Sequence, residues 1–412
     1  MKTIKKSFSQ WQRGRAKSIT FIVTKDCQLA CKYCYLVGKN SKEKMSWEVA
    51  KQAIDYILDR EDDMGEESVV WDFIGGEPFL EIDLIDQICD YLKEEMFRLD
   101  HHWFDSYRFS FSTNGINYDS EKVQQFISKN HDHLSIGITI DGTEKKHDLN
   151  RIWKGEGEER GSYRDVVRNI PLWLEQFPDA GTKVTISSAD IPYIKESVLH
   201  LYSLGIHEVN INCVFEDVWQ EGDDRLFEEQ LMELADAIID GRWYEDYACS
   251  FFSEHLGKPM DCRLHNQNWC GAGMMLSIDA AGNFYPCTRF AQYSLRNKKA
   301  WIIGNIRDGI DKNKLRPFLT LDRVRKARRN VSMAKWPKVA PGAKVKIMTL
   351  PIRRPFTNVP RPFAKCTRRV CMPIITIGTN CTANWKWKGS ARLLKRTGRS
   401  WTKKHVERCC NI

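Results

Sequence analysis

The first half of the chain alternates short apolar runs with longer amphipathic stretches. The apolar runs are rich in β-branched and aromatic residues, which favours strands; they cover residues 18–24, 68–74, 107–113, 134–140, 183–188 and 209–215. Between them, apolar residues recur at helical spacing, as in 46–60, 84–96 and 162–177. Ser46 and Ser120 stand where helix N-caps are expected. The alternation predicts an α/β fold, a parallel sheet covered by helices in an open or partial barrel of six strand–helix units.

Charge divides the chain at Arg323. From Val324 to Ile412 there are 23 lysines and arginines and one acidic residue, Glu407, so this tail carries a net charge of +22. The preceding residues hold 40 basic and 53 acidic side chains, for a net charge of −13. The tail also lacks the sustained helix or strand periodicity of the body. We therefore expect a basic N-terminal segment at 1–17, a barrel at 18–240, an extension at 241–323 and an atypical tail at 324–412.

The chain shows no sign of a membrane or secretory segment. No run of about 18 apolar residues appears, so no membrane span is expected. The basic start is not followed by the apolar stretch of a signal peptide. We therefore expect a cytoplasmic protein. In a reducing cytoplasm, clustered members of the 14 cysteines indicate metal ligands or catalytic thiols rather than disulfides.

Three cysteines lie close together after the first predicted strand. Cys27, Cys31 and Cys34 are spaced C-x3-C-x2-C, and Tyr33 precedes the third. In open parallel sheets, ligands bind at the carboxyl ends of the strands, which is where this loop begins. Three thiolates from one loop can hold three irons of a cubane and leave the fourth iron open. The alternative is a zinc knuckle with a distant fourth ligand.

The loop resembles the cysteine motif of the radical SAM superfamily and matches its C-x3-C-x2-C spacing in full. The resemblance implies a 4Fe–4S cluster whose unique iron binds the amino and carboxylate groups of S-adenosylmethionine. It also implies reductive cleavage to a 5′-deoxyadenosyl radical, which abstracts a hydrogen atom from the substrate. On this interpretation the cosubstrate supplies the ligand that the loop lacks.

The second strand ends in the sequence GGEP, which includes Gly75, Gly76 and Glu77. Glycines allow close approach of a ligand to the backbone, and a carboxylate can accept hydrogen bonds from an ammonium group. An ordinary turn at a strand end is the alternative. The segment resembles the one that binds the methionine amino group in radical SAM enzymes, which implies that Glu77 and the glycine backbone make this contact.

Later strand ends carry further candidates, in the sequences STNG and DGTEKKHDLNR. Both could be turn chemistry, because Asn-Gly and Asp-Gly favour turns. The family resemblance implies that Ser112, Asn114 and Asp141 lie near the adenosine or the substrate. His147, Asp148 and Arg151 resemble an H-D-x-x-R segment of peptide-modifying members, and Ser187 and Ser188 are weaker candidates at the fifth strand.

A second cysteine set follows the barrel. Cys270, Gly282 and Cys287 form a C-x11-G-x4-C pattern that resembles the opening of the SPASM extension, whose cysteines bind auxiliary iron–sulfur clusters. A structural hairpin with two buried cysteines is the alternative. Cys262 is a further candidate ligand. The remaining body cysteines fall in helix or strand patterns and are expected in the core: Cys89, Cys213 and Cys249.

The tail departs from the SPASM pattern, which continues with a dense cysteine block. After Arg323 the chain has Cys366, Cys371, Cys381 and the pair Cys409–Cys410, at none of the expected spacings. One explanation is a basic arm that binds nucleic acid or an acidic partner. The other is a shifted reading frame: read from each third base, the codons of residues 339–343 permit Cys-Ala-Trp-Cys. We favour a frameshifted SPASM end, with auxiliary cluster assembly in doubt.

Together these features favour a radical SAM peptide maturase with a partial (β/α)6 barrel and a SPASM-like extension, truncated or scrambled after about residue 323. The body resembles the subgroup acting on ribosomal peptides with cysteine-containing CXXX repeats. We expect a precursor peptide as substrate, flavodoxin or ferredoxin as reductant, one or more auxiliary 4Fe–4S clusters, and no nucleic-acid partner. The alternatives are a sulfatase-maturating SPASM enzyme and a non-enzymatic iron–sulfur protein with a nucleic-acid-binding tail.

Overall fold

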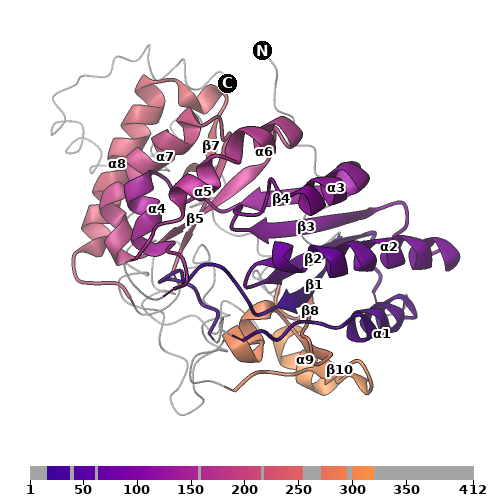
Figure 1. Ribbon diagram of the computed structural model, residues 1–412. Helices are drawn as coiled ribbons and strands as arrows, with labels where there is room; N and C mark the ends of the chain where they lie inside the picture. Colours follow the sequence, from indigo (N-terminus) through magenta and orange to yellow (C-terminus); the bar gives the residue numbers. More distant parts are fainter. Residues whose placement is uncertain are drawn as a thin grey trace, which may run out of the picture.

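The structure is a computed structural model that describes residues 16–37, 41–60, 64–155, 159–214, 218–253, 271–294 and 299–319. Strands and helices alternate through most of this part of the chain (Figure 1). The strands are β1 (Ala16–Thr24), β2 (Ser68–Gly75), β3 (Tyr107–Thr113), β4 (Leu134–Ile138), β5 (Gly181–Ile186), β6 (Glu208–Cys213), β7 (Ala248–Cys249), β8 (Leu276–Ile278), β9 (Asn283–Tyr285), β10 (Gly304–Asn305) and β11 (Gly309–Ile310). The helices are α1 (Trp47–Leu58), α2 (Ile82–Arg98), α3 (Glu121–Asn130), α4 (Glu144–Asn150), α5 (Tyr163–Val167), α6 (Ile170–Gln176), α7 (Ile194–Ser203), α8 (Asp223–Asp240) and α9 (Lys312–Leu319).

The predicted parallel sheet is confirmed. Strands β1, β2, β3 and β4 pair in this order and in parallel, and β5, β6 and β7 form a second parallel group. All six predicted strands are present, with ends shifted by up to two residues where the described part of the chain allows comparison. Because β1 to β4 all run the same way, the loops that follow these strands meet at one edge of the sheet.

Side chains rather than a backbone ladder link the two strand groups. The Thr182 hydroxyl on β5 donates to the Ile138 carbonyl of β4 at 2.7 Å and accepts from the Ile140 amide at 3.2 Å. Asp141 Oδ1, just beyond β4, accepts from the Thr185 amide of β5 at 3.0 Å. These bonds make the two groups one continuous wall from β1 to β6.

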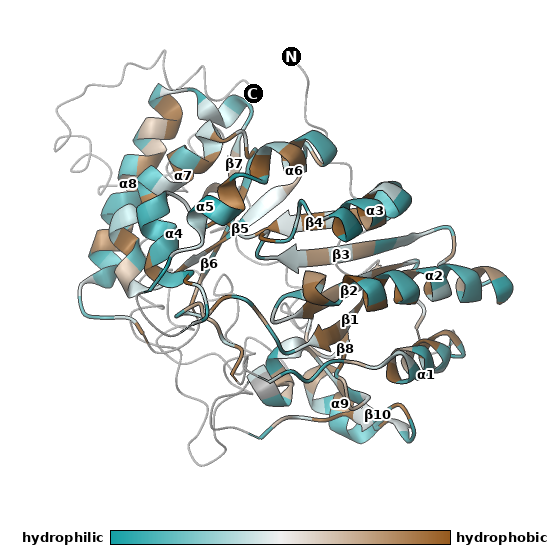
Figure 2. Cartoon of the chain, viewed as in Figure 1, coloured by the Kyte–Doolittle hydropathy of each residue, from teal (hydrophilic) through white to brown (hydrophobic). Residues whose placement is uncertain are grey.

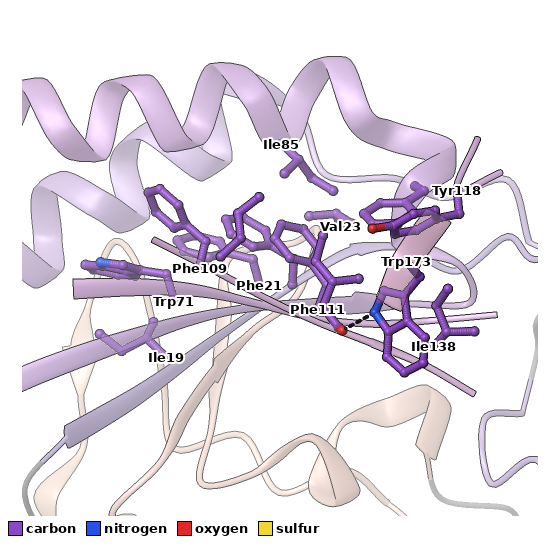
Figure 3. Close-up of a cluster of buried hydrophobic side chains, with 14 of the residues drawn as sticks. Ile19, Phe21, Val23, Trp71, Ile85, Phe109, Phe111, Tyr118, Ile138 and Trp173 are labelled. Atoms are coloured by element: carbon purple, nitrogen blue, oxygen red, sulfur yellow. Dashed lines mark hydrogen bonds between the residues drawn. The ribbon is translucent and has the colours of Figure 1, made fainter. Parts of the chain in front are cut away.

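The main core lies between the sheet and its helices. Side chains from alternate strand positions, including Phe21, Trp71, Phe109 and Phe111, pack beneath α1, α2 and α3 (Figure 3). Trp173 of α6 closes one end of this layer by donating its indole N–H to the Ile136 carbonyl at 2.8 Å. Figure 2 shows the outer turns of α2 and α3 as hydrophilic, as expected for helices with one buried face.

The helix starts and one helix break differ in part from the sequence pattern. Ser46 caps α1 as expected, its hydroxyl accepting from the Val49 amide at 3.3 Å, whereas Ser120 takes the N-cap position of α3 without a side-chain cap bond. The helical pattern over 162–177 forms two helices, α5 and α6, instead of one. Pro171 explains the break: it has no amide hydrogen to continue the helix and is favoured in a first turn.

The residues after the barrel extend the sheet at its first strand. Strand β8 pairs in parallel with β1, and β9, β10 and β11 follow as antiparallel neighbours; Figure 1 shows this orange segment beside the indigo β1. The β8–β9 hairpin turns at Gly282, whose φ is +75°, and Asp279 accepts from the amides of Ala281 and Asn283. In the part of the chain that the structure describes, no helix is long and apolar enough to cross a membrane.

Candidate functional site

The cysteine loop leaves the carboxyl end of β1 and is tied down on two sides. On one side the Glu77 amide, after β2, donates to the Asp26 carbonyl at 2.8 Å. On the other, the Ala30 amide donates to the Ile152 carbonyl at 2.8 Å and the Lys32 amide to the Asn150 carbonyl at 2.9 Å. The loop is therefore positioned by β2 and by the end of α4, far apart in sequence.

The donor set of this loop fits an iron–sulfur cluster. Cys27 is buried and its sulfur accepts from the Leu29 amide at 3.4 Å, while Cys31 and Cys34 are partly exposed. No His, Cys, Asp or Glu side chains among the described residues are grouped as around a single metal ion. A cubane places each cysteine sulfur on a different iron, so its ligand sulfurs stand farther apart than those of one ion. Three thiols on one loop suit that geometry and supply the ligand that iron–sulfur clusters use.

Gly75 and Gly76 allow the end of β2 to press against the loop. A Cβ at Gly75 would lie 2.4 Å from the Thr24 carbonyl oxygen, and a Cβ at Gly76 would lie 2.0 Å from the Asp26 carbonyl oxygen and 2.9 Å from Cys27 Cβ. Both distances to oxygen are too short for any real side chain. These glycines therefore allow the end of β2 to lie directly against the backbone that carries the cysteines.

Glu77 is 1% exposed and its carboxylate has three protein donors. Oε1 accepts from the Thr113 hydroxyl at 2.6 Å and from the Phe79 amide at 3.1 Å, and Oε2 accepts from the Asn114 amide at 2.7 Å. Burial raises the pKa of this carboxyl despite these donors. The side chain therefore joins the ends of β2 and β3, a structural role that the sequence alone did not suggest.

Asn114 connects this junction to the cysteines. Its side-chain Nδ2 donates to Gln28 Oε1 at 3.0 Å and lies 3.9 Å from Cys27 Sγ, while its Oδ1 accepts from the Ile116 amide at 2.9 Å. Ser112, two residues earlier, points elsewhere, and its hydroxyl accepts from Lys183 Nζ at 2.6 Å. Of these two candidates, Asn114 contacts the loop directly.

Asp141 lies in a buried network that reaches the loop through Tyr33. The Tyr33 hydroxyl donates to Asp141 Oδ2 at 2.6 Å and accepts from Arg151 Nη1 at 2.9 Å. Lys146 Nζ lies 3.6 Å from the same Asp141 oxygen and donates to the Thr185 carbonyl at 2.6 Å. Burial acts to raise the pKa of Asp141, but Lys146, Arg151 and His147 outweigh it, so this pKa is lowered and the carboxylate is charged.

The remaining candidates at the ends of the fourth and fifth strands bond to protein atoms outside the cysteine loop. His147 Nδ1 accepts from the Asp141 amide, and its Nε2 lies 3.0 Å from Ser162 Oγ. Asp148 accepts from the Tyr163 amide at 2.9 Å and caps α5. Ser187 donates to Asp190 in a capping box, with Ser188 next to it in the following turn. Of the side chains of His147, Asp148 and Arg151, that of Arg151 bonds to the cysteine loop.

Sequence reasoning missed several residues around the site. Tyr33 was noted only for its position, whereas its hydroxyl joins the loop to Asp141 and Arg151. Lys146 and Asp190 were not singled out, although they are buried charges 3.6 Å apart. In sequence, Lys146 is one of two adjacent lysines after a strand and looks like an ordinary surface charge. Only the fold shows that its side chain points inward, toward Asp141 and Asp190.

The second cysteine set is described in part. Cys287 is buried two residues after β9. Two residues further on, the guanidinium of Arg289 lies 4.6 Å from the centre of the Tyr35 ring. Tyr35 follows Cys34, so this hairpin lies against the first cysteine loop. Cys262 and Cys270 lie outside the described residues. As expected, the other cysteines of the body are in or against the core: Cys89, Cys213 and Cys249.

The sequence of this chain is similar to known proteins over its first half. Residues 21–211 match the family model of the radical SAM superfamily. An uncharacterized protein of Methanocaldococcus jannaschii, MJ0907, is 29% identical over 198 residues, which cover 48% of this chain and 63% of that protein. The chain thus matches less than two thirds of the length of this relative.

Solved structures agree in fold. The structure of native anSMEcpe with bound AdoMet aligns with a TM-score of 0.68 at 17% identity, covering 89% of this chain and 100% of that chain. A second structure of anSMEcpe, with AdoMet and the Kp18Cys peptide, gives a TM-score of 0.66. Streptococcus suis SuiB bound to S-adenosylmethionine aligns with a TM-score of 0.54 at 15% identity, covering 82% of this chain and 75% of that chain. Residues 21–211 of this chain thus match the radical SAM superfamily in sequence, and the fold agrees with that of the AdoMet-bound structures.

Proposed function

We propose that this chain is a radical SAM enzyme that reductively cleaves S-adenosylmethionine and modifies a ribosomally made peptide with cysteine repeats. The observation that carries the proposal is the C-x3-C-x2-C loop at the carboxyl end of β1, within a radical SAM domain. When bound, a reduced 4Fe–4S cluster and S-adenosylmethionine supply a 5′-deoxyadenosyl radical that abstracts a hydrogen atom from the substrate. Cys27, Cys31 and Cys34 would hold the cluster.

The residues around the loop favour that role. Arg151 is buried and interacts electrostatically with Cys31, so its positive charge favours the thiolate, which is the form that binds iron. Its Nε has no hydrogen-bond partner among the described residues and remains able to donate to a carboxylate of the cosubstrate. The Glu77 carboxylate is occupied by protein donors, so the backbone carbonyls of Gly75 and Gly76 are the better candidates to receive the methionine ammonium group.

The proposal of a peptide substrate rests on resemblance to peptide-modifying enzymes. The body resembles peptide maturases in the H-D-x-x-R segment and the second cysteine pattern, and a fold neighbour has been solved with a bound peptide. Asn114 and Asp141 would line the adenosine or substrate side of the site, because both lie at strand ends next to the loop. A flavodoxin or ferredoxin would supply the electron.

Replacing one loop cysteine tests the function directly. Wild-type protein, reconstituted anaerobically with iron and sulfide and reduced with dithionite, is expected to form 5′-deoxyadenosine from S-adenosylmethionine. Cys31→Ala is expected to lose this activity by at least about a hundredfold, because the cubane would lack one of its three protein ligands. Cys89→Ala, a cysteine buried in α2 away from the loop, is the matched control. Full cleavage by Cys31→Ala would contradict the proposal.

Product mass then separates the candidate reactions. A crosslinking maturase removes two hydrogens from the peptide per crosslink, whereas a sulfatase-maturating enzyme converts one Cys or Ser into formylglycine. A non-enzymatic iron–sulfur protein with a nucleic-acid arm would form no 5′-deoxyadenosine, and its nucleic-acid binding would weaken steeply with salt.

For the extension, we propose that Cys270 and Cys287 are the first auxiliary-cluster ligands of a SPASM-like end whose remaining ligands are missing. Cys287 is buried beside the first cysteine loop. The tail from Val324 lies outside the described residues, and its +22 charge and irregular cysteine spacing are the support for a shifted reading frame. On this proposal the first cluster is independent of the tail.

A further inference from the structure

The face of the sheet turned away from the helices carries a band of polar side chains. Successive strand residues point to opposite faces, and on β1, β2 and β3 the residues between the buried aromatics are Thr20, Asp72 and Ser110, which are aligned in register. Parallel strands packed on both faces are normally apolar on both. Toward the carboxyl ends of the same strands, Ile22 and Ile74 of this face pack in a small apolar cluster with Tyr285. The row of hydroxyls and a carboxylate therefore forms a polar band on the inner face beside that cluster.

A lysine from the second strand group reaches this inner face. Lys183 is on β5 with its side chain exposed, although β5 is part of the central wall. Its Nζ donates to Ser112 Oγ at 2.6 Å on β3, across β4. Gly137 of β4 pairs with Ser112 in register and has no side chain, which leaves the path across β4 open.

The charge of Lys183 is not matched by an ion pair. Among the described residues, no carboxylate oxygen lies within 4.0 Å of its Nζ. Asp72 is the acidic side chain that interacts with it electrostatically, but this carboxylate lies deeper and accepts from the Thr20 hydroxyl at 3.3 Å. An ammonium group has three N–H donors, and the Ser112 contact uses one.

The partner of this ammonium group, Ser112, belongs to the strand end that borders the cysteine site. Ser112 directly precedes Thr113, whose hydroxyl donates to Glu77 at 2.6 Å, and Asn114, whose side chain approaches Cys27. A substrate segment that passes along the polar band to reach the loop therefore meets Lys183 on the wall below it.

We propose that Lys183 is a specificity residue that binds a carboxylate of the substrate peptide. The inference rests on the proposed function, because it assumes that a peptide reaches the inner face. Charge-assisted hydrogen bonds are stronger than neutral ones and fix the position of the group that they hold. The carboxylate would come from an Asp or Glu side chain near the modified residue or from the free carboxyl terminus of the peptide.

Three short peptides distinguish these sources. The probes are acetyl-Gly-Asp-Gly-amide, acetyl-Gly-Asn-Gly-amide and acetyl-Gly-Asn-Gly with a free carboxyl terminus. Their dissociation constants are measured by saturation-transfer NMR on anaerobically reconstituted protein with S-adenosylmethionine. We expect at least one carboxylate peptide to bind about tenfold more tightly than the neutral one, the rough value of a charge-assisted contact. The tighter of the two identifies the source.

Substitutions assign the effect to Lys183. Lys183→Gln should abolish the preference for a carboxylate, and Lys183→Arg should retain it, which excludes misfolding as the cause. Lys195→Gln, an exposed lysine on α7 paired with Glu233, should bind like wild type. Equal binding of all three peptides by wild type, or a preference that survives in Lys183→Gln, would overturn the inference. Formation of 5′-deoxyadenosine by wild type is measured separately, so failure of the proposed function is distinguishable from failure of the carboxylate site.

Discussion

At the scale of single residues, small and buried side chains at the strand ends control the cysteine loop. Gly76 and Glu77 hold the loop against β2 by contact with the Asp26 backbone, and Tyr33 and Arg151 hold its other end. These residues bond to protein atoms and to one another, so the loop is positioned before any ligand binds. Preorganisation of this kind is what a site with demanding ligand geometry requires.

Gly76→Ala should impair cluster loading. The added Cβ would lie 2.0 Å from the Asp26 carbonyl and 2.9 Å from Cys27 Cβ, so the backbone that carries Cys27 must shift. We expect most of the iron bound after reconstitution to be lost, and the free energy of unfolding to fall by about 1–3 kcal/mol through overpacking. Gly65→Ala is the control, since nothing lies within 4 Å of a Cβ there. Iron and sulfide per chain equal to wild type would show that the loop tolerates the displacement.

His147 should make the fold acid-sensitive. Burial, and next the charge of Arg151, lowers the pKa of His147 to about 3, compared with about 6.5 in an unfolded chain. The neutral form is therefore favoured by folding, and the stability it contributes is present above pH 6.5 and lost as the pH falls toward 3. Between pH 6.5 and 5 the loss is about 2 kcal/mol. Urea unfolding at several pH values should show this slope in wild type and a shallower one in His147→Gln; identical slopes would contradict it.

At the scale of elements, the side-chain link between β4 and β5 closes the wall of the barrel. Thr182 is fully buried and bonds both to Ile138 and to Ile140. Thr182→Val keeps the shape but leaves a carbonyl and an amide without this partner, which should cost about 1–3 kcal/mol. Thr182→Ser keeps the hydroxyl and should lose less. Chemical denaturation measures both, and a valine variant as stable as wild type would mean that the link contributes nothing.

The elements themselves were predictable because their patterns are regular. Six strands followed from apolar runs, whereas the iron–sulfur interpretation of the loop rests on a spacing that few other sites share and stays a prediction. The sequence did not reveal the side-chain contacts around the loop, because these depend on long-range packing. From the sequence, Glu77 is a candidate for binding the cosubstrate, but in the structure its carboxylate accepts hydrogen bonds from Thr113 and Asn114. The split of α5 from α6 was foreseeable from Pro171.

At the scale of the whole molecule, the body and the tail of the chain carry net charges of opposite sign. Every contact described for the first cysteine loop comes from within the body, from residues between β1 and α5 and from the β8–β9 hairpin. The net charge of −13 before Val324 and +22 after it means that the two parts respond differently to salt and to polyanions. Among the described residues, the first cysteine loop is thus held by the acidic body.

A chain ended after Arg323 should therefore keep its first cluster. We expect about four irons per chain after reconstitution, the content of one 4Fe–4S cluster, in both the shortened and the full-length protein. If the tail cysteines bind an auxiliary cluster, the full-length protein will hold more iron than the shortened one, and the proposal of a shifted frame fails.

The DNA sequence across codons 318 to 350 tests the shifted reading frame independently. Third bases that encode a cysteine block in the shifted frame would mean that an intact form of this enzyme has a complete SPASM-like end, with auxiliary clusters that this chain lacks. Third bases that forbid those cysteines would make the basic tail a native arm, and its partner would then be sought among polyanions.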